Sequence, residues 1–180
     1  MITHLDNQKD ESIVKMFRFV AHHFCDVFKE LVPAGKGKLK MIKGEGQGVD
    51  RYMGVSINVT FDGNKEATYK MQQLSGGQKT VVALALVFAI QRADPAPFYL
   101  FDEIDAALDA QYRSALSNLI TQSADKAQFL VTTFKPEMCH RAAKHYEVVM
   151  RNKASTVRAI EKDRALEVIH QYRMQPRHED

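Results

Sequence analysis

Several kinds of protein are excluded by what this 180-residue sequence lacks. Its two cysteines, Cys25 and Cys139, lie far apart and form no Cys-x-x-Cys pair, so we expect reduced thiols and neither a disulfide framework nor a zinc site. The longest wholly apolar run, residues 81–90, is too short to cross a bilayer. The first six residues lack the basic and apolar regions of a signal peptide. These absences predict an intracellular protein.

A strong charge of either sign is also missing. The formal net charge of +3 and a pI near 8.8 permit contact with nucleic acid but do not argue for it. We interpret two basic clusters, Lys36 with Lys38 and Arg141 with Lys144, as solvated faces, and a DNA-binding groove is the alternative. Hydrophobic residues make up 45% of the chain, which is ordinary for a soluble protein with one buried core.

The sequence contains no P-loop, the Gly-x-x-x-x-Gly-Lys-Ser/Thr segment whose backbone cradles nucleotide phosphates. Residues 35–38 lack the spacing and the hydroxyl, and residues 44–48 lack the lysine. Any nucleotide site that this chain helps to build must therefore take its phosphate cradle from another segment or chain.

One amphipathic helix is predicted over residues 1–32, because apolar side chains recur at helical spacing among charged ones. Its apolar positions are Ile13, Phe17, Val20, Phe24, Val27 and Leu31. The helix is expected to end at the Pro-Ala-Gly segment 33–35. After a polar loop, residues 55–61 alternate between apolar and polar and predict a strand that ends at the Asp-Gly turn 62–63.

Strands and helices alternate in the second half of the sequence. We predict a helix over residues 76–92, a short apolar strand over 98–101, a helix through 108–120 and a second strand over 129–131. Strand, helix and strand in this order predict parallel strands with helices packed on them, which is an α/β fold. Three methionines in apolar strand contexts are expected in the core, namely Met41, Met71 and Met150.

The most informative segment is Leu74-Ser75-Gly76-Gly77-Gln78. Ser75 and Gln78 have the spacing of a capping box at a helix start, and the two glycines leave the helix N-terminus free of side chains. Backbone N–H groups and the helix dipole then favour an anion there. An ordinary capped core helix is the alternative. The five residues resemble the signature motif of ABC-type ATPases.

A second motif is the apolar strand 98–101 followed by Asp102 and Glu103. A carboxylate at the carboxyl end of a buried strand lies where ligands bind in open α/β sheets. There the first acid can hold Mg²⁺ and the second can orient or deprotonate water. This segment resembles a Walker B motif with its catalytic glutamate. The alternative is a strand that leads into an acid-rich helix start.

Residues 104–109 follow these acids and resemble the D-loop, which in ABC-type ATPases touches the opposite subunit near the nucleotide. Its acidic members are Asp105 and Asp109. Asp105 is also a candidate N-cap for the helix that follows, and both interpretations can hold together.

Residues 129–134 lie where the family has its switch strand. Many ABC-type ATPases end that strand with a histidine that contacts the γ-phosphate. The matching segment here is Thr133 with Phe134, so the histidine is missing. A core strand that ends in a hydroxyl is the alternative interpretation.

A signature motif and Walker B acids without a P-loop are typical of the structural maintenance of chromosomes (SMC) family. In that family the P-loop lobe is amino-terminal, the signature lobe is carboxy-terminal, and a long coiled coil separates them. Residues 73–113 carry the most specific resemblance, while 94–103 and 132–137 are similar to the third-subunit branch of cohesin SMC proteins. A condensin or double-strand-break repair ATPase is the runner-up. An ABC transporter ATPase and a non-enzymatic adaptor are less favoured.

The resemblance implies an α/β fold, the carboxy-terminal lobe of an ABC-type (SMC) ATPase head, with a mixed sheet, flanking helices and an amino-terminal coiled-coil neck helix. The neck would cover residues 1–32 and the lobe residues 33–180. In this family the amino-terminal region of the kleisin binds the neck. The candidate contacts are Phe17, Val20, Phe24 and Phe28, and pairing with the returning coil strand is their alternative role.

The resemblance also implies ATP and Mg²⁺ as cofactors. Residues 74–78 would close over the γ-phosphate of ATP bound by a partner head. Asp102 would hold Mg²⁺, directly or through water, and Glu103 would polarise the attacking water for ATP bound by this head's own P-loop lobe. Two ATPs would clamp two heads together until hydrolysis releases them. The isolated chain is expected to be inactive.

The implied partners are the amino-terminal Walker A lobe of the same subunit, the head of the first cohesin SMC subunit, the kleisin, and DNA or chromatin through the complex. No membrane partner is expected. The implied setting is the nucleus and the chromosome, where the complex maintains sister chromatid cohesion through DNA entrapment or loop extrusion.

Overall fold

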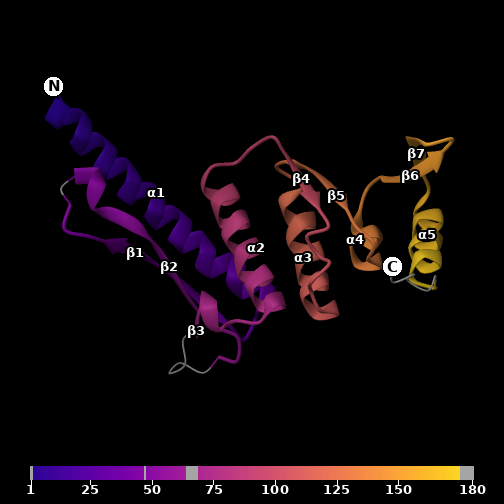
Figure 1. Ribbon diagram of the computed structural model, residues 1–180, viewed down its shortest axis with the longest axis horizontal. Coiled ribbons are helices and arrows are strands. Elements are labelled where there is room, and N and C mark those ends of the chain that lie inside the picture. The colour runs from indigo at the N-terminus through magenta and orange to yellow at the C-terminus, as the bar shows by residue number, and fades with distance from the viewer. Residues whose placement is uncertain (1, 47, 64–68, 175–180) are drawn as a thin grey trace. The chain divides into compact units, whose positions relative to one another are not determined.

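The computed structural model describes residues 2–46, 48–63 and 69–174, which form two compact units divided after Pro97 (Figure 1). Unit 1 ends at Pro97 and unit 2 begins at Phe98. The predicted boundary after residue 32 does not coincide with this division, because the end of the first helix belongs to the core of unit 1. The mixed α/β architecture with an amino-terminal helix is confirmed.

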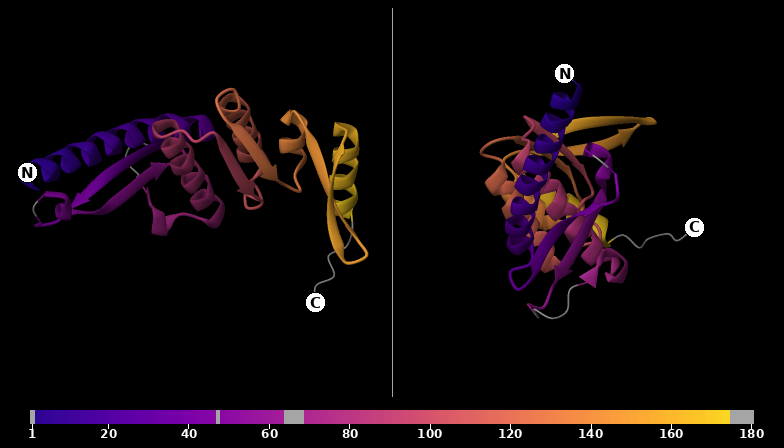
Figure 2. Two further views of the ribbon diagram at one scale, coloured as in Figure 1. Left: turned by 90° about the horizontal axis from the view of Figure 1, so that it is seen from above. Right: turned by 90° about the vertical axis from the view of Figure 1, so that its left-hand side faces the viewer.

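Unit 1 combines two long helices with a small antiparallel sheet. Its elements are α1 (Ile2–Leu31), β1 (Lys36–Lys43), the 3₁₀ turn η1 (Gly48–Arg51), β2 (Tyr52–Thr60), β3 (Tyr69–Lys70), the 3₁₀ turn η2 (Met71–Gln73) and α2 (Gly76–Ala93). The strand order is β1-β2-β3. In all three views of Figures 1 and 2, β1 and β2 run alongside α1.

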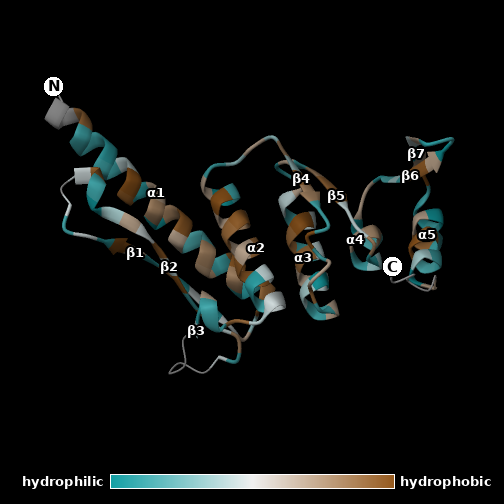
Figure 3. Cartoon of the chain, in the orientation of Figure 1, coloured by the Kyte–Doolittle hydropathy of each residue, from teal (hydrophilic) through white to brown (hydrophobic). Residues whose placement is uncertain are grey.

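The core of unit 1 lies where the last turns of α1 meet α2 and the sheet. Four apolar residues of α1 at helical spacing are at most 2% exposed, namely Phe24, Val27, Phe28 and Leu31. From α2, the fully buried residues include Val82, Ala85 and Phe88, and Figure 3 shows this helix as largely hydrophobic. Leu5, Met16 and Phe19, which precede Phe24 on α1, stay about half exposed, so only the last turns of the helix belong to this core.

Gly37 allows β1 to approach α1 closely. A Cβ atom at this position would lie 2.7 Å from Cε1 of Phe24 and 3.0 Å from Cγ of Phe28. The Sγ atom of Cys25 donates a hydrogen bond of 2.9 Å to the carbonyl oxygen of Gly37. Burial raises the pKa of this thiol, with a further contribution from Asp26, so it stays protonated and serves as a donor.

Ion pairs attach both ends of α1 to the rest of unit 1. Glu30 accepts two hydrogen bonds of 2.8 Å from the guanidinium group of Arg92, at the end of α2. Near the other end, Asp10 accepts hydrogen bonds of 2.6 Å from both Arg51 and Tyr52. Partly exposed pairs of this kind contribute about 0.5–1 kcal/mol, so they orient α1 more than they stabilise the unit.

Unit 2 begins with a parallel strand pair and ends with a hairpin and a helix. Its elements are β4 (Phe98–Asp102), α3 (Ala110–Ser123), β5 (Gln128–Thr132), α4 (Pro136–Arg141), β6 (His145–Arg151), β7 (Ala154–Ile160) and α5 (Lys162–Met174). β4 and β5 are parallel, which confirms the strand–helix–strand prediction. The pairing places Phe98 opposite Gln128 and Asp102 opposite Thr132.

The β4–β5 pair is apolar on both faces, and one face is uncovered. On one face the rings of Tyr99 and Phe129 stack with centroids 5.2 Å apart. On the other face Phe98, Leu100 and Leu130 are 60%, 70% and 46% exposed. Parallel strands are normally covered on both sides, and an isolated strand pair is marginal in water. The exposed face therefore lacks a covering layer.

The β6–β7 hairpin carries a second exposed apolar face. Asn152 and Lys153 form its turn with positive φ angles of 50° and 61°, as a tight hairpin turn requires. Tyr146, Val148 and Met150 alternate along β6 and are more than 60% exposed. The expectation of a core position for Met150 is thus wrong within this chain.

The sequence predicted most helices and strands but placed some ends imperfectly. The helix predicted over 76–92 is α2, and the strands predicted over 98–101 and 129–131 are β4 and β5. β1 was not predicted as a strand, because Gly37 interrupts its apolar face. α3 begins at Ala110, two residues after the predicted start.

We expect Gly37→Ala to lower the free energy of unfolding by about 1–3 kcal/mol, because the added methyl group overlaps the buried Phe24 ring. Gly76→Ala is the matched control, since a Cβ at Gly76 meets no atom within 4 Å. Urea unfolding of both variants measures the difference. Equal effects of the two substitutions would contradict the close approach of β1 and α1.

Candidate functional site

The N-terminus of α2 carries the predicted capping box. Ser75 is the N-cap, and its Oγ atom accepts a hydrogen bond of 3.3 Å from the backbone N–H of Gln78. In return, the Oε1 atom of Gln78 accepts one of 3.1 Å from the backbone N–H of Ser75. This reciprocal pair confirms the predicted capping geometry and fixes where the helix begins.

The space in front of this helix end is open. Ser75 and Gly76 are exposed, whereas Leu74 is only 6% exposed and anchors the segment in unit 1. A Cβ atom added at Gly76 would meet no atom within 4 Å. An 18-residue helix with an unobstructed N-terminus attracts an anion through its dipole, so the geometry is compatible with phosphate.

In unit 2, Thr132 holds the two predicted Walker B acids in place. The Oγ1 atom of Thr132 donates a hydrogen bond of 2.5 Å to Oδ1 of Asp102. The same Oγ1 atom accepts one of 3.1 Å from the backbone N–H of Glu103. Both carboxylates are exposed at the carboxyl end of β4. Sequence reasoning did not single out Thr132, although its place one residue before Thr133 was the available signal.

The backbone of Glu103 is strained. Its φ angle is +47°, in the left-handed region that residues other than glycine rarely adopt, at a cost of about 1–3 kcal/mol. The backbone N–H of Glu103 also donates a hydrogen bond of 3.2 Å to the carbonyl oxygen of Thr132, and this bond helps to maintain the strained conformation. Strained residues at a strand end are often functional, and this one turns the chain sharply after the two acids.

Asp105 lies inside unit 2. It is 1% exposed, and its Oδ2 atom accepts a hydrogen bond of 2.6 Å from Oγ1 of Thr133. Thr133 also accepts one of 2.9 Å from the backbone N–H of Lys135. The interpretation of Asp105 as an N-cap is wrong, because the N-cap of α3 is the exposed Asp109. Asp105 instead joins the predicted D-loop to the predicted switch segment.

Arg113 and Glu137 brace the same loop. Arg113 donates to Oε1 of Glu137 at 2.8–2.9 Å and to the carbonyl oxygen of Leu108 at 2.5 Å. Partial burial is the largest single influence and favours the neutral form of Glu137. The hydrogen bond from Arg113, a backbone hydrogen bond and the charges of Arg113 and Arg173 together outweigh it and leave the pKa of this carboxyl below its usual value. Burial, followed by the charge of Asp105, raises the pKa of the Cys139 thiol. A neutral thiol there is a poor metal ligand and nucleophile.

The aromatic ring at the predicted switch position packs against another ring of unit 2. Phe134 stacks on Tyr172 of α5, with ring centroids 4.4 Å apart and an interplanar angle of 16°. It has no group that can donate a hydrogen bond to phosphate. The nearest polar side chain in the segment is Thr133, which is occupied by Asp105.

Two of the four neck candidates need correction. Phe24 and Phe28 are 0% exposed, and both pack against Gly37 in the core of unit 1. They therefore cannot form a surface for a partner. Phe17 and Val20 are half-buried. Phe19, which the sequence pattern did not favour, is 52% exposed on the same helix.

The structure brings together the acids, the D-loop and the switch segment, all in unit 2, while the signature segment belongs to unit 1. Among the described residues no three His, Cys, Asp or Glu side chains cluster as a complete metal site. Asp102 alone fits Mg²⁺ in the way that nucleotide sites use one or two carboxylates and take the remaining ligands from phosphates and water.

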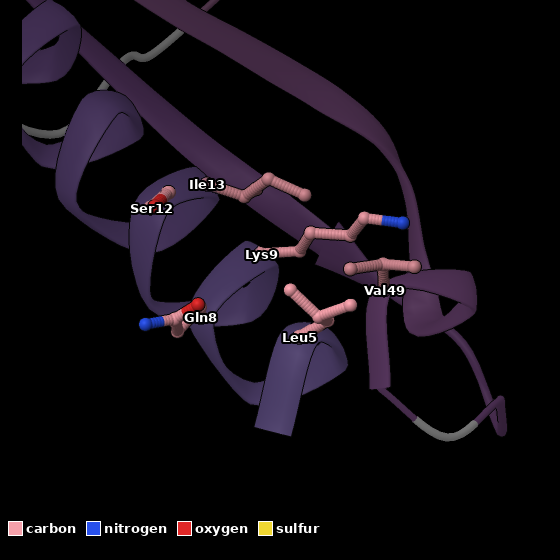
Figure 4. Close-up of a pocket in the computed structure, with 6 residues that line it drawn as sticks. All are labelled: Leu5, Gln8, Lys9, Ser12, Ile13 and Val49. Atoms are coloured by element: carbon pink, nitrogen blue, oxygen red, sulfur yellow. The ribbon is translucent and has the colours of Figure 1, made fainter. Parts of the chain in front are cut away.

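A hollow of about 430 Å³ lies elsewhere, between the start of α1 and η1 (Figure 4). It is open to solvent. Among the described residues its lining consists of one charged residue, Lys9, together with Leu5, Gln8, Ser12, Ile13 and Val49. None of these residues belongs to the predicted nucleotide motifs, so we assign it no ligand. Separately, none of the helices formed by the described residues has the length and apolar character needed to cross a membrane.

Comparison with known proteins identifies related chains. Residues 38–156 match the family described as RecF/RecN/SMC N terminal domain. Structural maintenance of chromosomes protein 3 of Arabidopsis thaliana is 53% identical over 94% of this chain. A Cryptococcus neoformans protein named urease accessory protein 2 is 48% identical over 94% of the chain. The name of that protein does not reflect this sequence similarity. The chain spans 16% of the length of each relative.

Solved structures agree with this family. A structure from work on ATP-driven dimerization and DNA-stimulated activation of SMC ATPases is 32% identical, with a TM-score of 0.79 over 93% of this chain and 99% of that one. The Smc head domain with a coiled coil and joint from Pyrococcus yayanosii is 31% identical, with a TM-score of 0.84 over 96% of this chain and 32% of that one. A Pyrococcus furiosus Smc head bound to the C-terminal domain of ScpA is 32% identical, with a TM-score of 0.77 over 96% and 42%.

Thr133→Val should lower the free energy of unfolding of unit 2 by about 1.5–3 kcal/mol, because it removes a donor from a buried carboxylate without changing the volume. The matched control is Thr156→Val in β7, whose hydroxyl makes an exposed hydrogen bond of 3.2 Å to Val149. We expect the control to change stability by less than about 0.5 kcal/mol. If thermal unfolding shows the same loss for both, Asp105 does not depend on Thr133.

Proposed function

The chain belongs to the RecF/RecN/SMC family and has the fold of an SMC ATPase head, and from this premise we propose that it is the carboxy-terminal half of the head of a cohesin SMC subunit. The name of the Arabidopsis relative supports the cohesin assignment. In this proposal the first part of α1 is the coiled-coil neck, and residues 33–180 are the lobe that carries the signature, Walker B and D-loop segments.

The observation that carries the proposal is the uncovered apolar face of β4–β5 in a chain without a P-loop. Phe98, Leu100 and Leu130 are exposed beside the strand end that bears Asp102. An amino-terminal lobe that brings Walker A would cover this face and supply the phosphate cradle at the same sheet edge. One missing layer thus accounts for both the exposed side chains and the incomplete nucleotide site.

For ATP bound by that amino-terminal lobe, Asp102 holds Mg²⁺ directly or through water, and Glu103 orients and polarises the attacking water. Bound Mg²⁺ and the phosphates supply the charge compensation that phosphoryl transfer needs. Thr132 positions both residues, since its hydroxyl bonds to the carboxylate of Asp102 and to the backbone of Glu103. The bend at Glu103 keeps its side chain from continuing the strand direction.

The signature segment acts on the other nucleotide. Ser75 and Gly76 at the open start of α2 face the γ-phosphate of ATP held by the partner head, the first cohesin SMC subunit. Two ATPs then join the two heads, and hydrolysis releases them. The exposed Asp109 is available to the partner, while the buried Asp105 maintains the shape of the D-loop.

The kleisin would bind through its amino-terminal region to the exposed side of the neck. Phe17 and Val20 remain candidate contacts, and the half-exposed Phe19 joins them. Packing against the returning coil strand is the competing role for these side chains. The assembled complex would act on DNA in chromatin within the nucleus, in sister chromatid cohesion by DNA entrapment or loop extrusion.

A second candidate is the head lobe of another SMC-like ATPase, of the condensin or double-strand-break repair type. The same α2 start and β4 acids would serve there, so the partner head distinguishes the two. ATP-dependent engagement with the first cohesin SMC head, and not with a condensin head, supports the cohesin assignment.

Glu103→Gln should slow ATP hydrolysis of the assembled head by about 10²–10⁴-fold, because the amide cannot accept a proton. Engagement of the partner head should persist, since the isosteric amide leaves phosphate binding intact. Steady-state turnover and ATP-dependent co-elution measure the two effects, with the exposed Glu161→Gln as control. Unchanged turnover in Glu103→Gln would remove this residue from the catalytic role.

Ser75→Arg should abolish ATP-dependent engagement, because a bulky side chain then occupies the open space in front of α2. ATP binding by the head's own P-loop lobe should be retained. Gln122→Arg, on an exposed position of α3, adds the same charge and serves as control. Light scattering with both heads and ATP measures the association. Normal engagement by Ser75→Arg would place the partner's phosphate elsewhere.

A further inference from the structure

Arg113 lies near the start of α3, just after the predicted D-loop. The first helical bond of α3 runs from its backbone N–H to the carbonyl oxygen of Asp109, at 2.9 Å. The carbonyl oxygen of Leu108 precedes this bond, and it accepts a hydrogen bond of 2.5 Å from Nη1 of Arg113. Leu108 is only 4% exposed, where a backbone oxygen needs a partner within the protein. The guanidinium group therefore fixes the end of the D-loop before the helix begins.

Two backbone hydrogen bonds connect this contact to Glu103. The N–H of Leu108 donates to the carbonyl oxygen of Asp105 at 3.2 Å. The N–H of Ala106 donates to the carbonyl oxygen of Glu103 at 3.1 Å. Because the two turns overlap, the chain from Glu103 to Leu108 forms a continuous series of turns. A shift of the Leu108 carbonyl group therefore reaches the strained bend that directs the Glu103 side chain.

On its other side, Arg113 is held by Glu137 in the first turn of α4. Its Nε and Nη2 atoms lie 2.9 and 2.8 Å from Oε1 of Glu137. The carbonyl oxygen of Glu137 also accepts a hydrogen bond of 3.0 Å from Oγ of Ser117, so α4 is attached to α3 at two points. Since α4 follows the predicted switch segment, one arginine joins the D-loop to the helix after that segment.

The burial of this ion pair points to a role in geometry. Arg113 and Glu137 have side chains 17% and 19% exposed. In each of the other ion pairs recorded among the described residues, at least one side chain is 35% exposed or more. Removing two charges from water costs about as much as their attraction returns, whereas the planar fork of arginine holds its partners in a defined arrangement. Because its contacts are protein groups, Arg113 is a positioning residue and not a catalytic one.

We propose that Arg113 is a positioning residue for ATP hydrolysis, and that it acts through the D-loop on Glu103. This role rests on the proposed function, in which Glu103 polarises the attacking water and the exposed Asp109 is available to the partner head. Asp109 is adjacent to Leu108, so a contact at Asp109 reaches the turn that Arg113 fixes. Arg113 thereby keeps Glu103 aligned when the partner head engages.

The test uses the head assembled from this chain, the amino-terminal Walker A lobe and the partner head. Arg113→Met removes the donors but keeps a long side chain. It should lower kcat by about 10- to 100-fold, because misplacing a catalytic group by about 1 Å costs up to about 10²-fold. The KM and the equilibrium affinity for ATP should change less than about twofold, since other segments hold the phosphates. Steady-state turnover and ATP binding measure the two effects.

Two further variants separate this role from charge and folding. Arg164→Met removes an arginine from exposed ion pairs with Glu147 and Glu167 in the same unit, and it should leave kcat unchanged. Arg113→Lys keeps the charge, but a single ammonium group cannot replace the fork that serves Leu108 and Glu137 together. It should lower kcat by at least about threefold, and it provides the measurement if Arg113→Met does not fold.

Combination with Glu103→Gln distinguishes positioning from general stabilisation. If Arg113 acts through Glu103, adding Arg113→Met to a Glu103→Gln head should lower the remaining turnover less than about twofold. A residue that only stabilises the lobe would lower turnover by the same factor in both backgrounds. Such an additive result would overturn the role proposed for Arg113.

Two sets of outcomes distinguish this role from the proposed function. An unchanged kcat in Arg113→Met, or a raised KM with unchanged kcat, overturns the role of Arg113 and leaves the proposed function in place. No turnover by the unmodified assembled head, or equal turnover with and without Glu103→Gln, overturns the proposed function and this role with it. A lowered kcat with unchanged KM that is not additive with Glu103→Gln supports both.

Discussion

The parallel pairing of β4 with β5 is the constraint on which the chemistry of this chain depends. Its register sets Asp102 opposite Thr132, and the threonine hydroxyl then fixes both the carboxylate and the bend at Glu103. One residue further, Thr133 and the buried Asp105 repeat the arrangement and shape the following loop. Because the strand pair is apolar on both faces, the same element that positions the acids also requires a further layer of protein to cover it.

Unit 1 presents an open helix end at the start of α2. Gly37 lets β1 pack closely on α1, and the last turns of α1 pack on α2. Ser75 and Gln78 then set where α2 begins, and the glycine beside them keeps that start open.

Local signals in the sequence predicted local structure well. The Ser-x-x-Gln spacing gave the capping box, and the apolar runs gave α2, β4 and β5, because each depends on neighbouring residues alone. Long-range contacts were beyond such reasoning. In the sequence Phe24 and Phe28 do not differ from other apolar positions of α1, and only the folded structure shows that they are buried. Asp105 has the sequence position of a helix cap, but in the structure it bonds to Thr133, just after β5. Met150 is apolar in a strand, yet it stays exposed among the residues that the structure describes.

The central claim is that this chain is one half of a composite ATPase head. ATP hydrolysis should be measured for the chain alone, then after adding an amino-terminal Walker A lobe, and finally after adding the partner head. The account predicts no turnover by the chain alone and turnover once all three parts are mixed, because the phosphate cradle and the second signature segment come from the added chains. Turnover by the chain alone that Glu103→Gln abolishes would contradict it, since a phosphate-binding site would then exist within these 180 residues.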